Sequence, residues 1–175
     1  MKKISILIIG IMYCLSAMGQ QTSLNDMVNI TLPEGIEKLT KEKFRSTVIS
    51  SAQRSAIDTK MGKGDFYKLN RGLMVLYSVQ GITPKNYLEQ TANRLKAMSS
   101  LSGDLPPNYK SEIKAINNYR VLVVQYDSES LHVYRFFAVN NTHTNALNGI
   151  MEFYISKKDK ETAILDEMLK SIKFK

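Results

Sequence analysis

The chain has 175 residues, of which 43% are hydrophobic and 23% are charged. This balance is typical of an ordinary globular protein, because the chain is too apolar to be disordered and too short for most two-domain proteins. It contains no tryptophan, two histidines and one cysteine. The cysteine count excludes a disulfide-bonded scaffold, a multi-cysteine zinc site and an iron–sulfur protein.

The start of the chain has the pattern of a secretory signal peptide. Two lysines follow the first methionine, an apolar run covers residues 4–15, and small residues end at Gly19. We predict a signal peptide over residues 1–19, cleaved after Gly19, and a single globular domain over residues 20–175. A membrane anchor is the alternative, but the apolar run is shorter than the roughly 20 residues that span a bilayer.

Cys14 raises the possibility of a lipoprotein, in which a lipidated cysteine follows a small residue. Here the preceding residue is the bulky Tyr13. We therefore expect cleavage after Gly19, which leaves a mature chain without cysteine that is held together by its core alone. The predicted location is periplasmic or extracellular.

The mature chain is mildly basic. Removing Lys2 and Lys3 with the leader leaves 22 basic residues against 16 acidic ones, a net charge of +6. Export makes nucleic acid an unsuitable partner, and the basic residues are scattered among acids, which indicates a solvated cationic face. The alternative is weak contact with an anionic membrane surface, lipopolysaccharide or an acidic protein.

The first part of the mature chain predicts strands and a helix. A strand is expected over Val28–Leu32, where apolar and polar residues alternate before a turn at residues 33–35. Thr40 can cap a helix that continues to Ser51, with Phe44 on its apolar face. Two strands separated by a turn are then expected at residues 66–69 and 73–79.

The clearest helix is expected after Thr83 and Pro84. Thr83 has a hydroxyl that can cap a helix, and a proline at the first helical position follows it, which is typical of a helix start. The apolar stripe of this helix includes Leu88, Leu95 and Met98. Gly103 lies beyond the last of them, where the helix is expected to stop.

The second half predicts antiparallel strands joined by short turns, followed by a helix. Strands are expected at residues 109–116, 119–126, 131–139 and 149–155, with a polar loop at 140–148. The second and third of these are apolar on both sides, which indicates helices packed on each face of the sheet. The last helix is expected from Ser156, with Leu165, Met168 and Leu169 on its buried side.

Two segments near the ends of the mature chain resemble the Mog1/PsbP-like superfamily. Residues 30–40 contain its LP-x-G turn after an early strand, and residues 164–174 contain its SI-x-F phrase after a final helix. The resemblance covers residues 26–175. It implies an α+β fold, an α/β/α sandwich whose central, mainly antiparallel sheet of about six or seven strands is flanked by helices.

The resemblance also implies a binding role. The superfamily includes photosystem accessory proteins, a regulator of a nuclear-transport GTPase and many exported bacterial proteins, and most known members bind proteins rather than catalyse reactions. No functional residue can be carried over, because no site motif in this chain matches one.

The sequence contains no motif of a known catalytic site. The chain lacks G-x-S-x-G, and the glycines at 62 and 64 lack the end of a P-loop. His132 is expected to be a satisfied, partly buried strand residue and His143 an exposed loop residue, which makes a poor metal site. We expect no catalytic, cofactor-binding or metal-binding residue, and no enzymatic activity.

Acidic pairs on the last helix are a further candidate for acid–base chemistry, which needs carboxylates that converge in a cleft. Asp159 and Glu161 form one pair, and Asp166 and Glu167 form the other. Their spacing away from the apolar stripe predicts that all four face solvent.

Two functions fit these observations. We expect an exported, non-enzymatic protein-binding or accessory module whose partner is another exported or envelope protein. The alternative is a carrier of a small hydrophobic ligand or lipid in a pocket between a helix and the sheet, since six methionines remain in the mature chain. A groove beside Tyr67, Tyr77 and Arg71 is one place where such a pocket could form.

Overall fold

The computed structural model describes residues 19–24, 26–47, 64–70, 72–101 and 103–175. Most of the predicted leader with Cys14, the continuation of the first helix to Ser51, and Arg71 lie outside these ranges.

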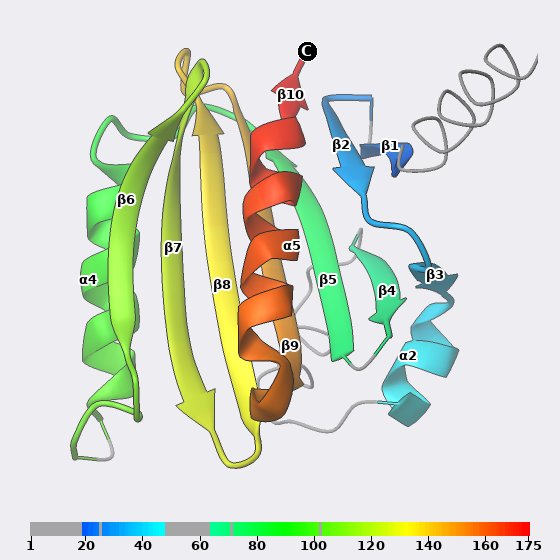
Figure 1. Ribbon diagram of the computed structural model, residues 1–175. Helices are drawn as coiled ribbons and strands as arrows, with labels where there is room; N and C mark the ends of the chain where they lie inside the picture. The colour runs from blue at the N-terminus through cyan, green and yellow to red at the C-terminus, as the bar shows by residue number, and fades with distance from the viewer. Residues whose placement is uncertain (1–18, 25, 48–63, 71, 102) are drawn as a thin grey trace, which may run out of the picture.

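A seven-stranded antiparallel sheet forms the centre of the fold (Figure 1). Its strand order is β3-β4-β5-β9-β8-β7-β6. The strands are β3 (Glu37–Leu39), β4 (Asp65–Leu69), β5 (Gly72–Gln80), β6 (Lys110–Ile116), β7 (Tyr119–Ser128), β8 (Leu131–Asn140) and β9 (Asn145–Tyr154).

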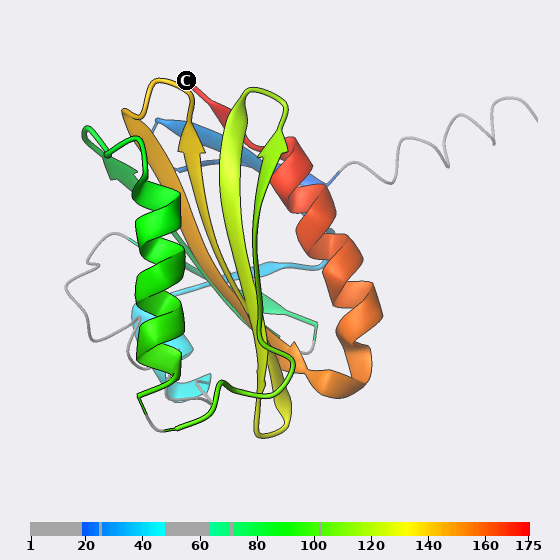
Figure 2. The ribbon, with the colours of Figure 1, turned by 90° about the vertical axis from the view of Figure 1, so that its left-hand side faces the viewer.

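Helices cover both faces of this sheet (Figure 2). On one face lies α5 (Lys158–Ser171), preceded by the short 3-10 helix η1 (Ile155–Lys157); on the other lie α4 (Tyr87–Ser99) and α2 (Lys41–Thr47). Phe136 and Phe137 of β8 are adjacent in sequence, yet they belong to the cores under α5 and under α4 respectively. The predicted α+β sandwich with helices on each face is confirmed.

A second, three-stranded sheet joins the two ends of the described chain. Its order is β1 (Gln20–Leu24), β2 (Val28–Leu32) and β10 (Lys173–Phe174), all antiparallel. The backbone N–H of Lys175 also donates to the carbonyl of Met27 at 2.9 Å. The sequence predicted β2 with its bounds but neither of its two partners.

The first helix begins as predicted. The backbone N–H of Lys43 donates to the Thr40 hydroxyl at 3.2 Å, which is the bond expected of a capping residue. Phe44 is fully buried and its ring packs 4.7 Å from that of Phe66 in β4. This contact holds α2 against the edge of the sheet.

The start of the second helix was predicted wrongly. It begins at Tyr87 rather than at Pro84, because the turn between β8 and β9 engages the expected capping residue. The backbone N–H of Thr83 donates to the carbonyl of His143 at 2.8 Å. Met98 was expected on the buried stripe and is 58% exposed, because it lies at the border of the side that Leu88 and Leu95 define.

The polar loop predicted at residues 140–148 is also wrong in its second half. β9 begins at Asn145, and Asn148 is only 4% exposed. Asn148 is in register with Tyr77 of β5 and Phe137 of β8, so this segment is hydrogen-bonded on both sides. Pairing with two apolar strands overrides the local polarity of the segment.

Candidate functional site

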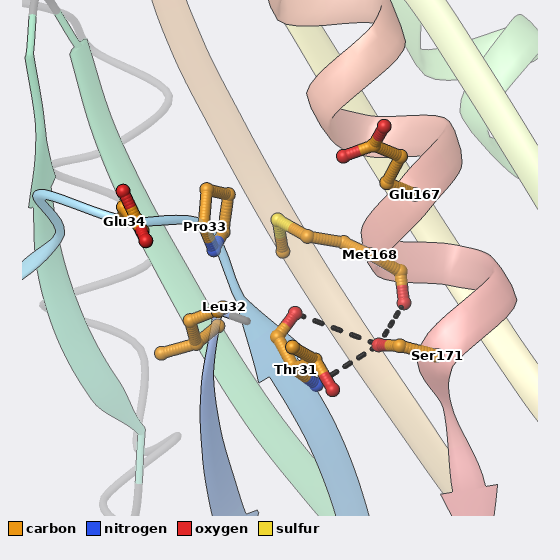
Figure 3. A pocket seen from close by; sticks show the side chains of 8 residues that line it. Thr31, Leu32, Pro33, Glu34, Glu167, Met168 and Ser171 are labelled. Carbon is orange, nitrogen blue, oxygen red and sulfur yellow. Dashed lines mark hydrogen bonds between the residues drawn. The ribbon is translucent and has the colours of Figure 1, made fainter. Parts of the chain in front are cut away.

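A pocket of about 390 Å³ lies between the end of β2 and α5 (Figure 3). Its walls come from the residue before β1, from the end of β2 with the turn that follows, and from the last turns of α5. The lining residues are Gly19, Thr31, Leu32, Pro33, Glu34, Glu167, Met168 and Ser171. The LP-x-G turn and the SI-x-F phrase, far apart in the sequence, therefore meet at this pocket.

The turn after β2 positions the first of the two acidic side chains in the pocket. Pro33 follows the last strand residue, and Gly35 adopts a φ of 76°, a left-handed conformation that glycine adopts without strain. The chain thereby leaves β2 sharply, and Glu34 is presented at the tip of the turn (Figure 3).

Ser171 links α5 to β2 beside the pocket. The backbone N–H of Thr31 donates to the Ser171 hydroxyl at 2.9 Å, and this hydroxyl donates to the carbonyl of Met168 at 2.7 Å. Serine suits the last turn of a helix because its hydroxyl can bond a carbonyl one turn back. The Ser171 side chain therefore caps the end of α5 and holds β2 against it.

Ser171→Ala is expected to lower the free energy of unfolding by about 1–2 kcal/mol, because the partly buried N–H of Thr31 loses its acceptor. Chemical denaturation followed by circular dichroism measures the loss. Ser100→Ala is the matched control, since Ser100 also bonds a carbonyl one turn back, that of Ala97 at 3.0 Å, but is exposed and reaches no second element. Equal losses in the two variants would contradict the linking role.

Glu34 and Glu167 lie on opposite sides of the pocket, with Pro33 and Met168 between them (Figure 3). Both acids are exposed, and within the described ranges neither has a hydrogen-bond or ion-pair partner. No basic residue is among those that line the pocket, although the whole chain has a net charge of +8. Two carboxylates attract a cation, and the proline and methionine surfaces suit an aliphatic stem.

His132 forms a buried pair with a carboxylate. Its side chain is fully buried and contacts Asp127, its register partner on β7, while its ring meets that of Tyr134 edge-on at 4.8 Å. Asp127 also accepts a hydrogen bond from Asn108 Nδ2 at 2.5 Å. Nδ1 of the histidine contacts Asp127, and the side chain is fully rather than partly buried, which separates it from any dissolved substrate.

His143 holds a turn rather than lying in an exposed loop. It is half-buried between β8 and β9 with a φ of 57°. Its Nδ1 lies 3.3 Å from the Thr83 hydroxyl. The structure therefore does not bring the two histidines together, and it gives each a separate structural contact.

The groove suggested beside Tyr67 and Tyr77 is not formed, because the two rings lie on opposite faces of the sheet. Tyr67 is in register with Met74, and alternation along β5 places Tyr77 on the other side. Tyr67 belongs to the core under α5, whereas Tyr77 packs beside Leu73 and Val75. Burial raises the pKa of both hydroxyls, as for ordinary core tyrosines.

Glu161 does not face solvent as predicted. It is 8% exposed, whereas Asp166 and Glu167 are exposed, and the Asp159 side chain is outside the described part. The reason is its position one turn before Leu165, on the side of α5 that packs on the sheet. Burial raises the pKa of the Glu161 carboxyl above its usual range.

The end of α4 presents a second surface feature, a short apolar segment. Leu101 is 83% exposed, Met98 is 58% exposed and Leu105 is 37% exposed. This segment leads from α4 to β6, on the opposite side of the sheet from α5 (Figure 2). It is a separate surface from the pocket.

Within the described ranges, no three or more histidine, cysteine, aspartate or glutamate side chains gather in a way that could hold a metal ion. In the same part of the chain, no helix has the length and apolar character needed to cross a membrane.

Sequence reasoning did not identify Glu34, Glu167 or Ser171 as site residues. Glu167 was predicted only to face solvent, and the other two were noted only as parts of family-like segments. Ser171 and Thr31 are 140 positions apart, and no local pattern indicates that they touch. The one available signal was the resemblance itself, since the segments 30–40 and 164–174 that carry it contain these residues.

Comparisons with known proteins identify the fold. No family model and no curated protein matches the sequence. The solution structure of cyanobacterial PsbP (CyanoP) from Synechocystis has a TM-score of 0.58 and 12% identity, covering 91% of this chain and 94% of that chain. The crystal structure of the Ran-binding protein Mog1p from Saccharomyces cerevisiae has a TM-score of 0.51 and 8% identity, covering 90% and 96%. The chain has the Mog1/PsbP-like fold.

Proposed function

We propose that the protein is an exported, non-enzymatic accessory module that binds another exported or envelope protein through the pocket between β2 and α5. The observation that carries the proposal is the pair of carboxylates, Glu34 and Glu167, which have no partner among the described residues. A lysine or arginine side chain of the partner fits this arrangement, with its charged head between the acids and its stem on Met168. Mog1p, which has the same fold, is named for binding Ran.

A binding role without catalysis is supported by the position of His132. Its pairing with Asp127 resembles part of an acid–base pair, but full burial removes it from the surface where a substrate would arrive. Export is supported by the start of β1 at Gln20, the residue expected to be first in the mature chain.

A short labelled peptide with a single central lysine tests the pocket by fluorescence anisotropy. We expect it to bind the wild type, and we expect the Glu34→Gln/Glu167→Gln variant to raise its Kd by about tenfold, which corresponds to about 1.4 kcal/mol. The same peptide with norleucine in place of lysine has the stem without the charge. We expect the norleucine peptide to bind both proteins with the same Kd. The difference in affinity between the lysine and norleucine peptides for the wild type is expected to fall as salt is added.

Two further variants separate the pocket from other surfaces. Glu129→Gln removes an exposed carboxylate in the turn between β7 and β8, and is expected to leave the Kd unchanged. Leu101→Ser changes the apolar segment after α4. Binding that is lost in Leu101→Ser and kept in the double acidic variant would overturn the pocket as the binding site. A small-molecule adduct seen only in the native mass spectrum would favour the carrier instead.

A further inference from the structure

The pocket includes the residue that precedes the predicted cleavage point. Gly19 lines it together with Glu34 and Glu167. Its backbone lies close to the end of β2, because a Cβ added at Gly19 would lie 2.3 Å from the carbonyl oxygen of Leu32. Gln20 follows as the first residue of β1, in register with Leu32. The bond expected to be cut therefore lies at the edge of the pocket.

Cleavage changes the charge at this position. In the uncut chain the nitrogen of Gln20 is a neutral amide, and after cleavage it becomes an α-amino group that is mostly protonated at neutral pH. β1 remains paired with β2 over five residues, which keeps the new amino terminus beside the pocket. The described lining offers this cation two carboxylates and no competing basic group.

We propose that processing after Gly19 places the α-ammonium of Gln20 against Glu34 and Glu167, and that cyclisation of Gln20 to pyroglutamate removes this cation and frees the carboxylates for a basic side chain of the partner. The inference rests on the proposed function, because it requires export and cleavage at this bond. It adds a modification site at Gln20 that regulates the pocket.

The cyclisation needs no oxidant and no second substrate. The neutral α-amine of Gln20 attacks its own side-chain amide carbon, so that a new C–N bond forms. The bond from that carbon to the side-chain nitrogen breaks, and the nitrogen leaves as ammonia with the proton released by the amine. The product is a neutral five-membered lactam that keeps the backbone carbonyl needed for β1.

The carboxylates control the rate of this step through the protonation of the amine. Only the neutral amine attacks, and neighbouring carboxylates favour the ammonium, which raises the amine pKa above its usual value of about 7.7–8.0. Each unit of that increase reduces the neutral fraction, and with it the rate, about tenfold at a pH below the pKa. Pairing in the pocket therefore protects Gln20 from cyclisation.

Intact-mass spectrometry of protein exported from its own host tests the inference. We expect a chain that begins at Gln20 and then becomes lighter by one ammonia during incubation. We expect the Glu34→Gln/Glu167→Gln variant to cyclise about three- to tenfold faster than the wild type, as a shift of the amine pKa by up to one unit requires. Glu129→Gln is the control with an unchanged rate. High salt should accelerate the wild type towards the rate of the double variant, without any mutation.

Each outcome decides the inference. A mature chain that begins elsewhere, or equal cyclisation rates in the wild type and the double variant, would overturn the role of Gln20. The lysine-peptide measurement would then still report on the proposed function, since it depends on the two carboxylates alone. Tighter binding of the lysine peptide to the cyclised protein than to the uncyclised one would support both the proposed function and the role of Gln20. Weaker binding to the cyclised protein would contradict the proposed regulation by Gln20.

Discussion

Gly149→Ala is expected to lower the free energy of unfolding by about 3 kcal/mol, the upper end of what an added methyl group costs in a packed core. Gly149 of β9 lies in register with Phe136 of β8 on one side and Leu76 of β5 on the other. A Cβ at this position would lie 2.3 Å from Cε1 and Cζ of Phe136 and 2.9 Å from Cδ2 of Leu76. Both neighbours are fully buried, so neither can move aside freely. Urea denaturation measures the loss.

The double variant Gly149→Ala/Phe136→Leu tests the cause of that loss. The smaller leucine makes room for the added methyl group, so we expect the two substitutions together to cost less than the sum of the two alone. The single variant Phe136→Leu completes the double-mutant cycle. Strictly additive losses would show that Gly149 is required for another reason, such as backbone conformation, and would contradict the packing explanation.

Asp127→Ala is expected to lower the free energy of unfolding by about 1–3 kcal/mol, the usual cost of leaving a buried hydrogen-bonding group without its partner. The substitution removes a carboxylate from His132, which is fully buried, and an acceptor from Asn108. The loss therefore affects both the β7–β8 hairpin and the loop before β6. Chemical denaturation at neutral pH gives its magnitude, and hydrogen exchange shows whether it is confined to that end of the sheet.

Asp166→Ala is the matched control for this prediction. Asp166 is exposed on α5, and its removal is expected to change stability by less than about 0.5 kcal/mol. Replacing both partners, as in Asp127→Ala/His132→Leu, is expected to recover part of the loss, because a buried apolar side chain needs no hydrogen-bond partner. A loss in Asp127→Ala no larger than in the control would contradict a stabilising role for the pair.

Most of the large sheet could be predicted from sequence because its strands carry local signals. β7 and β8 are strongly apolar and are bounded by short polar turns, at Asn117 and Asn118 before β7 and at Glu129 and Ser130 between the two strands. β9 carried a weaker signal, since the segment from Asn145 to Asn148 is polar and becomes a strand only between two apolar neighbours. Its start was therefore placed too late.

In the small sheet only β2 carries such a signal. β1 is mostly polar, and β10 contains only two residues, so neither has a period to detect. Both form because β2 offers them backbone partners, and the residues paired across β2 and β10 are far apart in sequence. The candidate site likewise depends on a contact between segments that are far apart in the sequence. Glu34 and Glu167 are ordinary exposed acids in the sequence, and only the contact of β2 with α5 places them at one pocket.

The three-stranded sheet can be completed only after β10 has been synthesised. Val28 of β2 pairs with Phe174 of β10, so β2 cannot gain this partner until residue 174 has been synthesised. A contact between such distant residues forms late, because the intervening chain must first be ordered. β2 consequently stays without this partner while the chain between β2 and β10 is being synthesised.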